Sequence, residues 1–116
     1  MEGPSEAARR ELLEGSFDEL TSVLASTGDR GLVKAFLTSL LTPSERLDIA
    51  ARWELVNRID LGETQRRVAL ELGVSLCKIT RGSKELKKPD SAFKAMLRLR
   101  DQLFIQENPR VPQTLP

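Results

Sequence analysis

Helix start and stop signals recur along this chain of 116 residues, and no run alternates apolar with polar residues as a half-buried strand does. The clearest start is Thr42-Pro43-Ser44-Glu45, which combines a capping hydroxyl, a proline at the first helical position and a glutamate in the capping-box position. Gly62 is placed to take the left-handed conformation that ends a helix. These signals predict an all-α protein.

The spacing of apolar residues between these signals predicts six helices. Ser16 and Glu19 have capping-box spacing at the start of the first helix, and the third helix is expected to be the longest. The expected helices are 17–26, a segment from after Asp29 to about residue 40, then 43–61, 65–72, 76–87 and about 91–106.

One compact helical domain is expected over residues 16–106. Residues 1–15 are expected to be a weakly ordered arm, because Gly15 should end the short helical segment that starts at Ser5. Residues 107–116 carry three prolines and are expected to be a disordered tail. Short helices with apolar stripes need a second surface to cover them, so we expect a homodimer. The stripe of the second helix contains Phe36, Leu37, Leu40 and Leu41.

Residue composition argues against an enzyme or a metal protein. The chain has one cysteine, Cys77, and no histidine, so zinc sites and histidine-dependent catalysis lack their usual groups. We therefore expect no catalytic residues and no metal ligands. No stretch is as apolar as a membrane span, and the first residues lack the apolar core of a signal peptide. The expected location is the cytoplasm.

Charge is distributed unevenly along the chain. Residues 1–60 hold 7 Lys and Arg against 11 Asp and Glu, whereas residues 61–116 hold 11 against 6. Between Thr64 and Lys88 seven cationic residues face only two carboxylates, Glu71 and Glu85. Such a segment is suited to an anionic partner such as DNA, although a basic helix face can also be merely solvated.

Residues 64–83, TQRRVALELGVSLCKITRGS, have the pattern of a helix-turn-helix, and the motif is expected to span about 64–87. Ala69 permits two helices to cross closely, Gly73 permits the tight turn, and Ser75 caps the second helix. In such a motif the second helix enters the major groove of DNA with its first residues at the base edges. The helix dipole does not favour a cation at the start of a helix, so helix stability does not explain Arg66 and Arg67. Contact with phosphate or guanine would explain their presence there.

Three runs give the chain a family resemblance: LLTPSER at 40–46, LGETQRR at 61–67 and ITRGS at 79–83. On these runs the chain resembles the tryptophan repressor family over about residues 32–103. The resemblance implies an intertwined, all-helical homodimer that binds double-stranded operator DNA. It also implies that L-tryptophan acts as a corepressor beside each recognition helix, with genes for tryptophan biosynthesis or uptake as targets and no other cofactor.

The resemblance also assigns site residues. The positions that would bind L-tryptophan are Thr42, Arg52, Arg81 and Gly82, and we add Glu85, which stands where the family has a serine near the ligand's amino group. Two guanidinium planes can hold a flat indole ring between them. The positions that would contact DNA are Gln65, Arg66, Leu76, Cys77 and Thr80, to which the basic pattern adds Arg67 and Lys78.

Other interpretations of single residues stay open at this point. Arg52 on its own is as well explained as a surface charge, and the capping role of Thr42 explains that residue fully. Glu85, if it turns outward, would pair with Lys88 or Arg81 and would not meet a ligand.

Other interpretations of the whole chain also stay open. The region after Glu63 is one residue shorter than in the best-known members of the family, and Leu76 with Cys77 replaces a different apolar and small pair, which leaves the operator sequence open. The alternatives are a regulator of the same superfamily that responds to another ligand or to none, and a protein-interaction module. Redox sensing by Cys77 is a further one.

Overall fold

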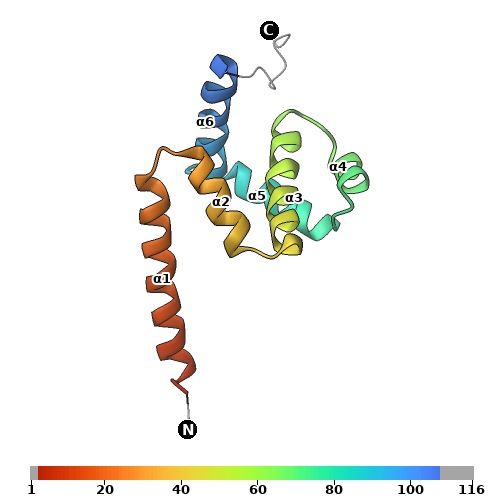
Figure 1. The fold of residues 1–116 in the computed structure, drawn as a ribbon. Helices are drawn as coiled ribbons and strands as arrows, with labels where there is room; N and C mark the ends of the chain where they lie inside the picture. Colours follow the sequence, from red (N-terminus) through yellow and green to blue (C-terminus); the bar gives the residue numbers. More distant parts are fainter. Residues whose placement is uncertain (1–2, 108–116) are drawn as a thin grey trace. The chain divides into compact units, whose positions relative to one another are not determined.

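The protein is described here by a computed structural model, which defines residues 3–107, and this part of the chain contains six α-helices and no strands. The expected all-α class is confirmed. The helices are α1 (Glu6–Ser26), α2 (Arg30–Leu40), α3 (Pro43–Asp60), α4 (Gln65–Leu72), α5 (Leu76–Lys87) and α6 (Ala92–Glu107), shown in Figure 1. The predicted disordered tail lies outside the described residues, apart from Glu107 at the end of α6.

The chain divides into two compact units, Met1–Arg46 and Leu47–Pro116. The boundary falls in the first part of α3, so the first unit holds α1 and α2, and the second holds most of α3 together with α4, α5 and α6.

In the first unit, α1 is longer than the sequence predicted. It starts after Ser5, whose hydroxyl accepts a hydrogen bond from the Ala8 backbone N–H at 3.1 Å, and it continues without interruption through Gly15 and Ser16. The predicted break at Gly15 and the predicted start at Phe17 are therefore wrong. A glycine in a helix costs only about 1 kcal/mol relative to alanine, and its neighbours here are mostly strong helix formers. The prediction that the third helix is the longest is also wrong, since α1 has 21 residues and α3 has 18.

The start of α3 follows the predicted capping signals, and α2 has a cap that the sequence analysis did not name. Asp29 caps α2 by accepting a hydrogen bond from the Leu32 backbone N–H at 3.1 Å. Before α3, the Thr42 backbone N–H donates to Glu45 Oε1 at 2.8 Å and the Glu45 backbone N–H donates to Thr42 Oγ1 at 3.1 Å. This reciprocal pair is the predicted capping box. Neither α1 nor α2 has a buried residue, so the first unit has no core of its own within the described residues.

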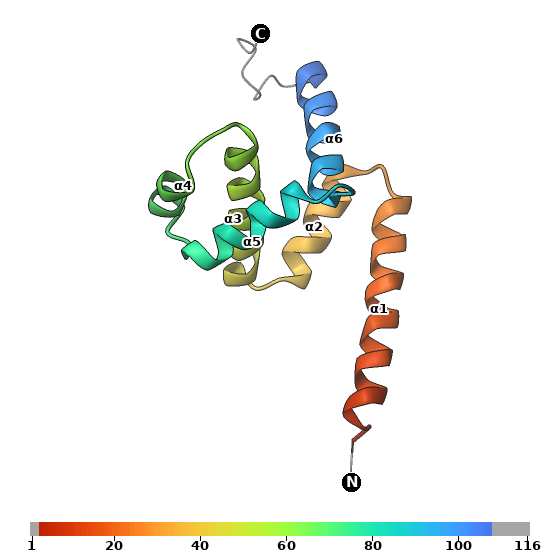
Figure 2. The same ribbon diagram turned by 180° about the vertical axis from the view of Figure 1, so that it is seen from behind.

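The second unit has a continuous core to which all four of its helices contribute. Its buried apolar side chains are Leu55 and Val56 on α3, Val68 on α4, Ile79 and Leu86 on α5, and Leu97 on α6. In Figure 2, α5 passes across α3 and leads into α6. A buried polar link joins α6 to α3, because Arg100 Nη1 donates to Asn57 Oδ1 and Asn57 Nδ2 donates to the Trp53 carbonyl at 2.7 Å.

Helices α4 and α5 pack on each other across a three-residue connection. Thr64 and Ser75 cap them by accepting hydrogen bonds from the backbone N–H groups of Arg67 and Lys78, at 3.2 and 3.3 Å. Gly73 ends α4 with a φ of +64°, a conformation that favours glycine. Between the two helices the side chains of Val68 and Ile79 are fully buried. The predicted bounds of both helices are confirmed.

Candidate functional site

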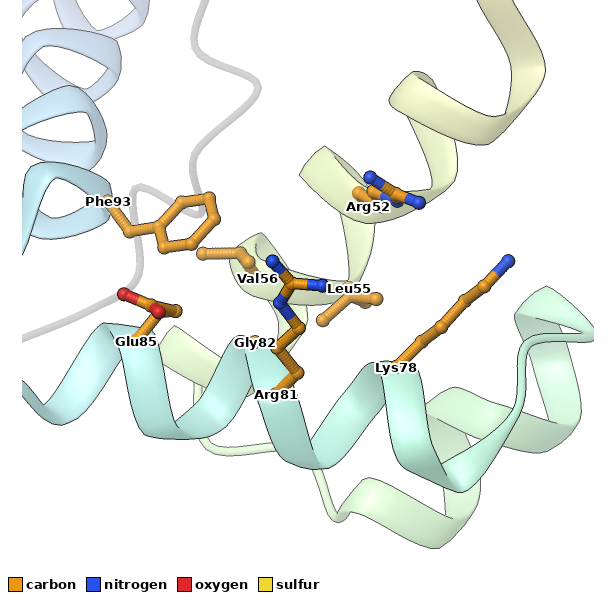
Figure 3. Close-up of a pocket in the computed structure, with 8 residues that line it drawn as sticks. All are labelled: Arg52, Leu55, Val56, Lys78, Arg81, Gly82, Glu85 and Phe93. Carbon is orange, nitrogen blue, oxygen red and sulfur yellow. The ribbon is translucent and has the colours of Figure 1, made fainter. Parts of the chain in front are cut away.

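A cavity of about 260 Å³ lies in the second unit between α3, α5 and the start of α6 (Figure 3). Residues 78, 81, 82 and 85 recur at intervals of three and four, so one face of α5 forms its floor. Helix α3 and the first turn of α6 supply the remaining walls. The lining residues are Arg52, Leu55, Val56, Lys78, Arg81, Gly82, Glu85 and Phe93.

The charged groups of the cavity are arranged along α5. Lys78 extends from the first turn of α5 toward the opening that Arg52 also faces, and Arg81 rises from the next turn (Figure 3). Glu85 lies at the far end, below the ring of Phe93. The cavity therefore offers three cations, an aromatic ring and the apolar side chains of Leu55 and Val56, with a single carboxylate at one end. This combination suits a flat, anionic or zwitterionic small molecule.

Gly82 sets how closely α5 approaches α3. A Cβ built on Gly82 would lie 2.7 Å from Leu55 Cδ1, closer than real side chains come. Leu55 is 1% exposed and belongs to the core. Any larger residue at this position would therefore shift either α5 or the Leu55 side chain, so Gly82 has a packing role in addition to the predicted ligand role.

Glu85 lines the cavity and also forms an ion pair. Its carboxylate lies 3.0 Å from Lys88 Nζ, one turn further along the chain. The pair is partly exposed, and exposed pairs of this kind contribute about 0–1 kcal/mol, so a ligand ammonium can compete with Lys88. The pair with Lys88 is the alternative that the sequence left open, and contact of Glu85 with a ligand stays a prediction.

Four of the five residues predicted to bind a ligand line this one cavity: Arg52, Arg81, Gly82 and Glu85. The fifth, Thr42, belongs to the first unit, where its hydroxyl serves the capping box, and its part in ligand binding stays a prediction. The sequence analysis missed the apolar walls Leu55, Val56 and Phe93, and it assigned Lys78 only to DNA. Its position three residues before Arg81 was the signal that could have placed Lys78 in the cavity.

The residues predicted to contact DNA lie on α4 and on the start of α5, and all of them are exposed: Gln65, Arg66, Arg67, Leu76, Cys77, Lys78 and Thr80. Leu76, an apolar residue, is 60% exposed in the first turn of α5. The Cys77 thiol is free. Because Ile79 and Ser83 of the same helix are buried, one side of α5 faces the core and the other is available to a partner.

An ion-pair network fixes α4 to α3. Arg58 Nη1 donates to Glu71 Oε1, its Nε donates to Glu54 Oε2 at 3.1 Å, and Arg67 Nε donates to Glu71 Oε2 at 2.8 Å. The hydrogen bonds from Arg67 and then Arg58 lower the pKa of the Glu71 carboxyl below its ordinary value. Arg67 is thereby held on the surface of α4 by an acidic neighbour one turn away.

Among the residues that the structure describes, no group of histidine, cysteine and acidic side chains is arranged to hold a metal ion. None of the helices in this part of the chain is long and apolar enough to cross a membrane.

Comparison with known proteins identifies the family. The family model described as Trp repressor protein matches residues 15–101. A Trp operon repressor homolog of Vibrio parahaemolyticus is 37% identical over 84 residues, which are 72% of this chain and 82% of the relative. A Trp operon repressor homolog of Xylella fastidiosa is 37% identical over 86 residues, which are 73% of this chain and 91% of the relative. One of Chlamydia trachomatis is 47% identical over 58 residues, 49% of this chain and 62% of that protein. No solved structure matches the chain. With three quarters of its length matched by the family model, this chain belongs to the Trp repressor protein family.

Proposed function

We propose that this chain is a sequence-specific DNA-binding repressor of transcription that acts as a homodimer, with L-tryptophan as its corepressor. Members of the family are DNA-binding regulators and not enzymes. The proposed targets are genes for tryptophan biosynthesis or uptake, in keeping with the names of the similar proteins.

The observation that carries the proposal is the cavity between α3 and α5, where Arg52 and Arg81 stand on different helices. Guanidinium groups stack on aromatic faces, and they bind carboxylates through directed N–H groups. Glu85 supplies an acceptor for the ammonium of an amino acid. A cavity with these three groups and the ring of Phe93 matches the parts of tryptophan: a flat ring, a carboxylate and an ammonium.

DNA binding is supported by the exposed surface of α4 and α5. In the described part of the chain the two carboxylates of this basic segment, Glu71 and Glu85, are both ion-paired, whereas no ion pair involves Arg66, Lys78 or Lys84. The unneutralised cations suit phosphate, and the first turn of α5 presents Leu76, Cys77 and Thr80 for contact with base edges. We therefore interpret α4 and α5 as a helix-turn-helix.

One helix, α5, links the two proposed sites. Its inner face lines the cavity through Arg81, Gly82 and Glu85, and its outer residues are the proposed base contacts. A ligand that bridges α3 and α5 therefore fixes the orientation of the residues that meet DNA. Linkage then requires L-tryptophan and operator DNA to raise each other's affinity by the same factor.

Homodimer formation is supported by the apolar side chains that the single chain leaves uncovered. The helices of the first unit have no buried residue, although they carry large apolar side chains that are exposed. Extended apolar exposure marks a surface for association. The exposed apolar residues of α1 and α2 are Leu12, Leu13, Phe17, Val23, Leu32, Phe36 and Leu40. We expect sedimentation equilibrium to show a dimer at micromolar concentration, and a stable monomer would contradict this part of the proposal.

The function is tested by selecting bound genomic fragments and measuring their affinity with and without L-tryptophan. We expect L-tryptophan to tighten DNA binding, and DNA to tighten L-tryptophan binding by the same factor in calorimetry. Arg81→Ala should remove this coupling while leaving the dimer folded, because Arg81 is exposed. Failure to retain any DNA fragment would contradict a DNA-binding function. If the protein binds DNA with the same affinity with and without L-tryptophan, a regulator that responds to another ligand or to none is favoured instead.

A further inference from the structure

We propose that the two adjacent arginines of α4 have different roles, so that Arg66 contacts DNA and Arg67 positions α4 through Glu71. This assignment rests on the proposed function. The basic pattern of the sequence predicted DNA contact for both arginines. In the structure the guanidinium of Arg67 is hydrogen-bonded within the ion-pair network that joins α4 to α3, whereas Arg66 forms no ion pair within the described residues.

The first argument is the direction of the Arg67 side chain. Its Nε donates to Glu71 Oε2 at 2.8 Å, and the other oxygen of that carboxylate accepts from Arg58 Nη1 on α3. Arg67 therefore extends along α4, on the helix face of Glu71, toward the carboxylate that joins α4 to α3. Consecutive residues of a helix project about 100° apart, so Arg66 lies on a different face of α4.

The second argument is that helix stability does not account for the pair. A cation near the start of a helix and a carboxylate in its last turn both oppose the helix dipole, and Arg before Glu is the less favourable order at this spacing. Contact of Glu71 with Arg58 accounts for it. Arg58 is itself held by Glu54 at 3.1 Å, and its Nη1 lies 3.8 Å from Glu63 Oε1. Arg67 thus orients a carboxylate whose second oxygen ties α4 to α3.

The third argument is the charge of the network. Arg58 and Arg67 supply two cations, which face three carboxylates, those of Glu54, Glu63 and Glu71. Phosphate contacts gain their affinity from cations that replace the counterions of DNA. A cation that the protein has already neutralised contributes less of this gain. Arg66 differs, because it is exposed and has no ion-pair partner in the described part of the chain.

The packing of α4 explains why such a tie matters. This helix, which the structure describes in full, has a single buried side chain, Val68, while Ala69 and Leu72 pack on the core and are partly buried. One deep anchor leaves the rotation of a short helix weakly constrained. Rotation would move Gln65 and Arg66, and binding residues must be held within a narrow range of positions by the groups around them. The network supplies a second anchor.

The salt dependence of DNA binding tests the assignment, measured by fluorescence anisotropy on a bound DNA fragment with L-tryptophan present. We expect Arg67→Met to weaken binding about threefold to tenfold and to leave the slope of log affinity against log salt unchanged, because no phosphate contact is lost. Arg66→Met should weaken binding and also make this slope shallower by about one or relax the base preference at one position. Arg67→Lys, which can still pair with Glu71, should retain most of the affinity.

Glu71→Gln gives a test of opposite sign. Charge alone predicts that loss of a carboxylate strengthens binding to a polyanion, whereas loss of the positioning contact weakens it. We expect weaker binding, by the same factor as in Arg67→Met, and no further loss in the double variant, because both residues act through one network. The matched control is Asp90→Asn, which removes an exposed carboxylate without an ion pair in the described part of the chain and should tighten binding slightly. Circular dichroism at the assay concentration shows whether each variant is folded.

Three results would overturn the assignment. A slope that becomes shallower by about one in Arg67→Met would make Arg67 a phosphate contact. Tighter DNA binding in Glu71→Gln, or unchanged binding in both variants, would show that the network does not position α4 for DNA. If the unaltered protein binds no DNA fragment, the proposed DNA-binding function fails and the assignment fails with it, a result that differs from the other two.

Discussion

Replacing Gly82 by alanine perturbs the packing of α5 on α3 beside the cavity. The added Cβ would lie 2.7 Å from Leu55 Cδ1, so either α5 moves away from α3 or the Leu55 methyl group moves. Leu55 is 1% exposed, and the free space beside it is the cavity that it helps to line. Both adjustments change the cavity, the first by widening it and the second by filling it.

The cost of Gly82→Ala follows from two opposing terms. Overpacking a core by one methyl group costs about 1–3 kcal/mol, and replacing a helical glycine by alanine returns about 1 kcal/mol. We therefore expect a net loss of about 1 kcal/mol in the free energy of unfolding. Gly15→Ala is the matched control, because this glycine is also helical but an alanine methyl group there would meet nothing within 4 Å. It should gain about 0.5–1 kcal/mol.

The assay is denaturant unfolding of both variants at one protein concentration, since a dimer's stability depends on concentration. Calorimetry then measures L-tryptophan affinity, which should fall about tenfold or more in Gly82→Ala and stay unchanged in Gly15→Ala. If Gly82→Ala is as stable as Gly15→Ala and binds L-tryptophan normally, α5 and α3 do not approach as closely as described and the reasoning is refuted.

Three further results are expected. Gly73→Ala should lower the unfolding free energy by about 1–2 kcal/mol in chemical denaturation, because alanine is strained at the positive φ of this residue. The hydrogen bond from Arg67 lowers the pKa of the Glu71 carboxyl, so the carboxylate stabilises the fold fully above its ordinary pKa. This stabilisation is lost as the pH falls through the lowered pKa. Glu71→Gln should therefore make the free energy of unfolding less dependent on pH in the acid range. L-tryptophan should bind more tightly than indole-3-propionate, which lacks the ammonium, and competitive calorimetry should show that Glu85→Gln narrows the difference.

The sequence predicted the elements whose signals are local. The bounds of α4 and α5 were right because a capping hydroxyl, a left-handed glycine and a buried apolar residue all agree there. The start of α1 was wrong because the argument relied on Gly15 alone. One glycine lowers helix stability by a small amount, which the surrounding helix formers of a long segment can offset.

The cavity was predicted only in part, since its walls come from elements distant in the sequence. The family resemblance supplied Arg52 and Arg81, but the place of Phe93 depends on how α6 packs after α5. Lys78, which the basic pattern assigned to DNA, also lines the cavity, and its contact with DNA stays a prediction. Its charge alone fits phosphate and carboxylate equally well.

The crossing of α3 and α5 explains why an anionic ligand, in the proposed function, would affect DNA binding. Without a ligand, Arg52 on α3 faces Lys78 and Arg81 on α5, and like charges across a partly enclosed space repel. An anion between them turns this repulsion into attraction and holds α5 against α3, at the distance that Gly82 permits. A ligand can shift α5 only by its difference in affinity for the two arrangements. Neutral indole, which has the ring but no charge, should therefore bind without tightening the affinity for DNA.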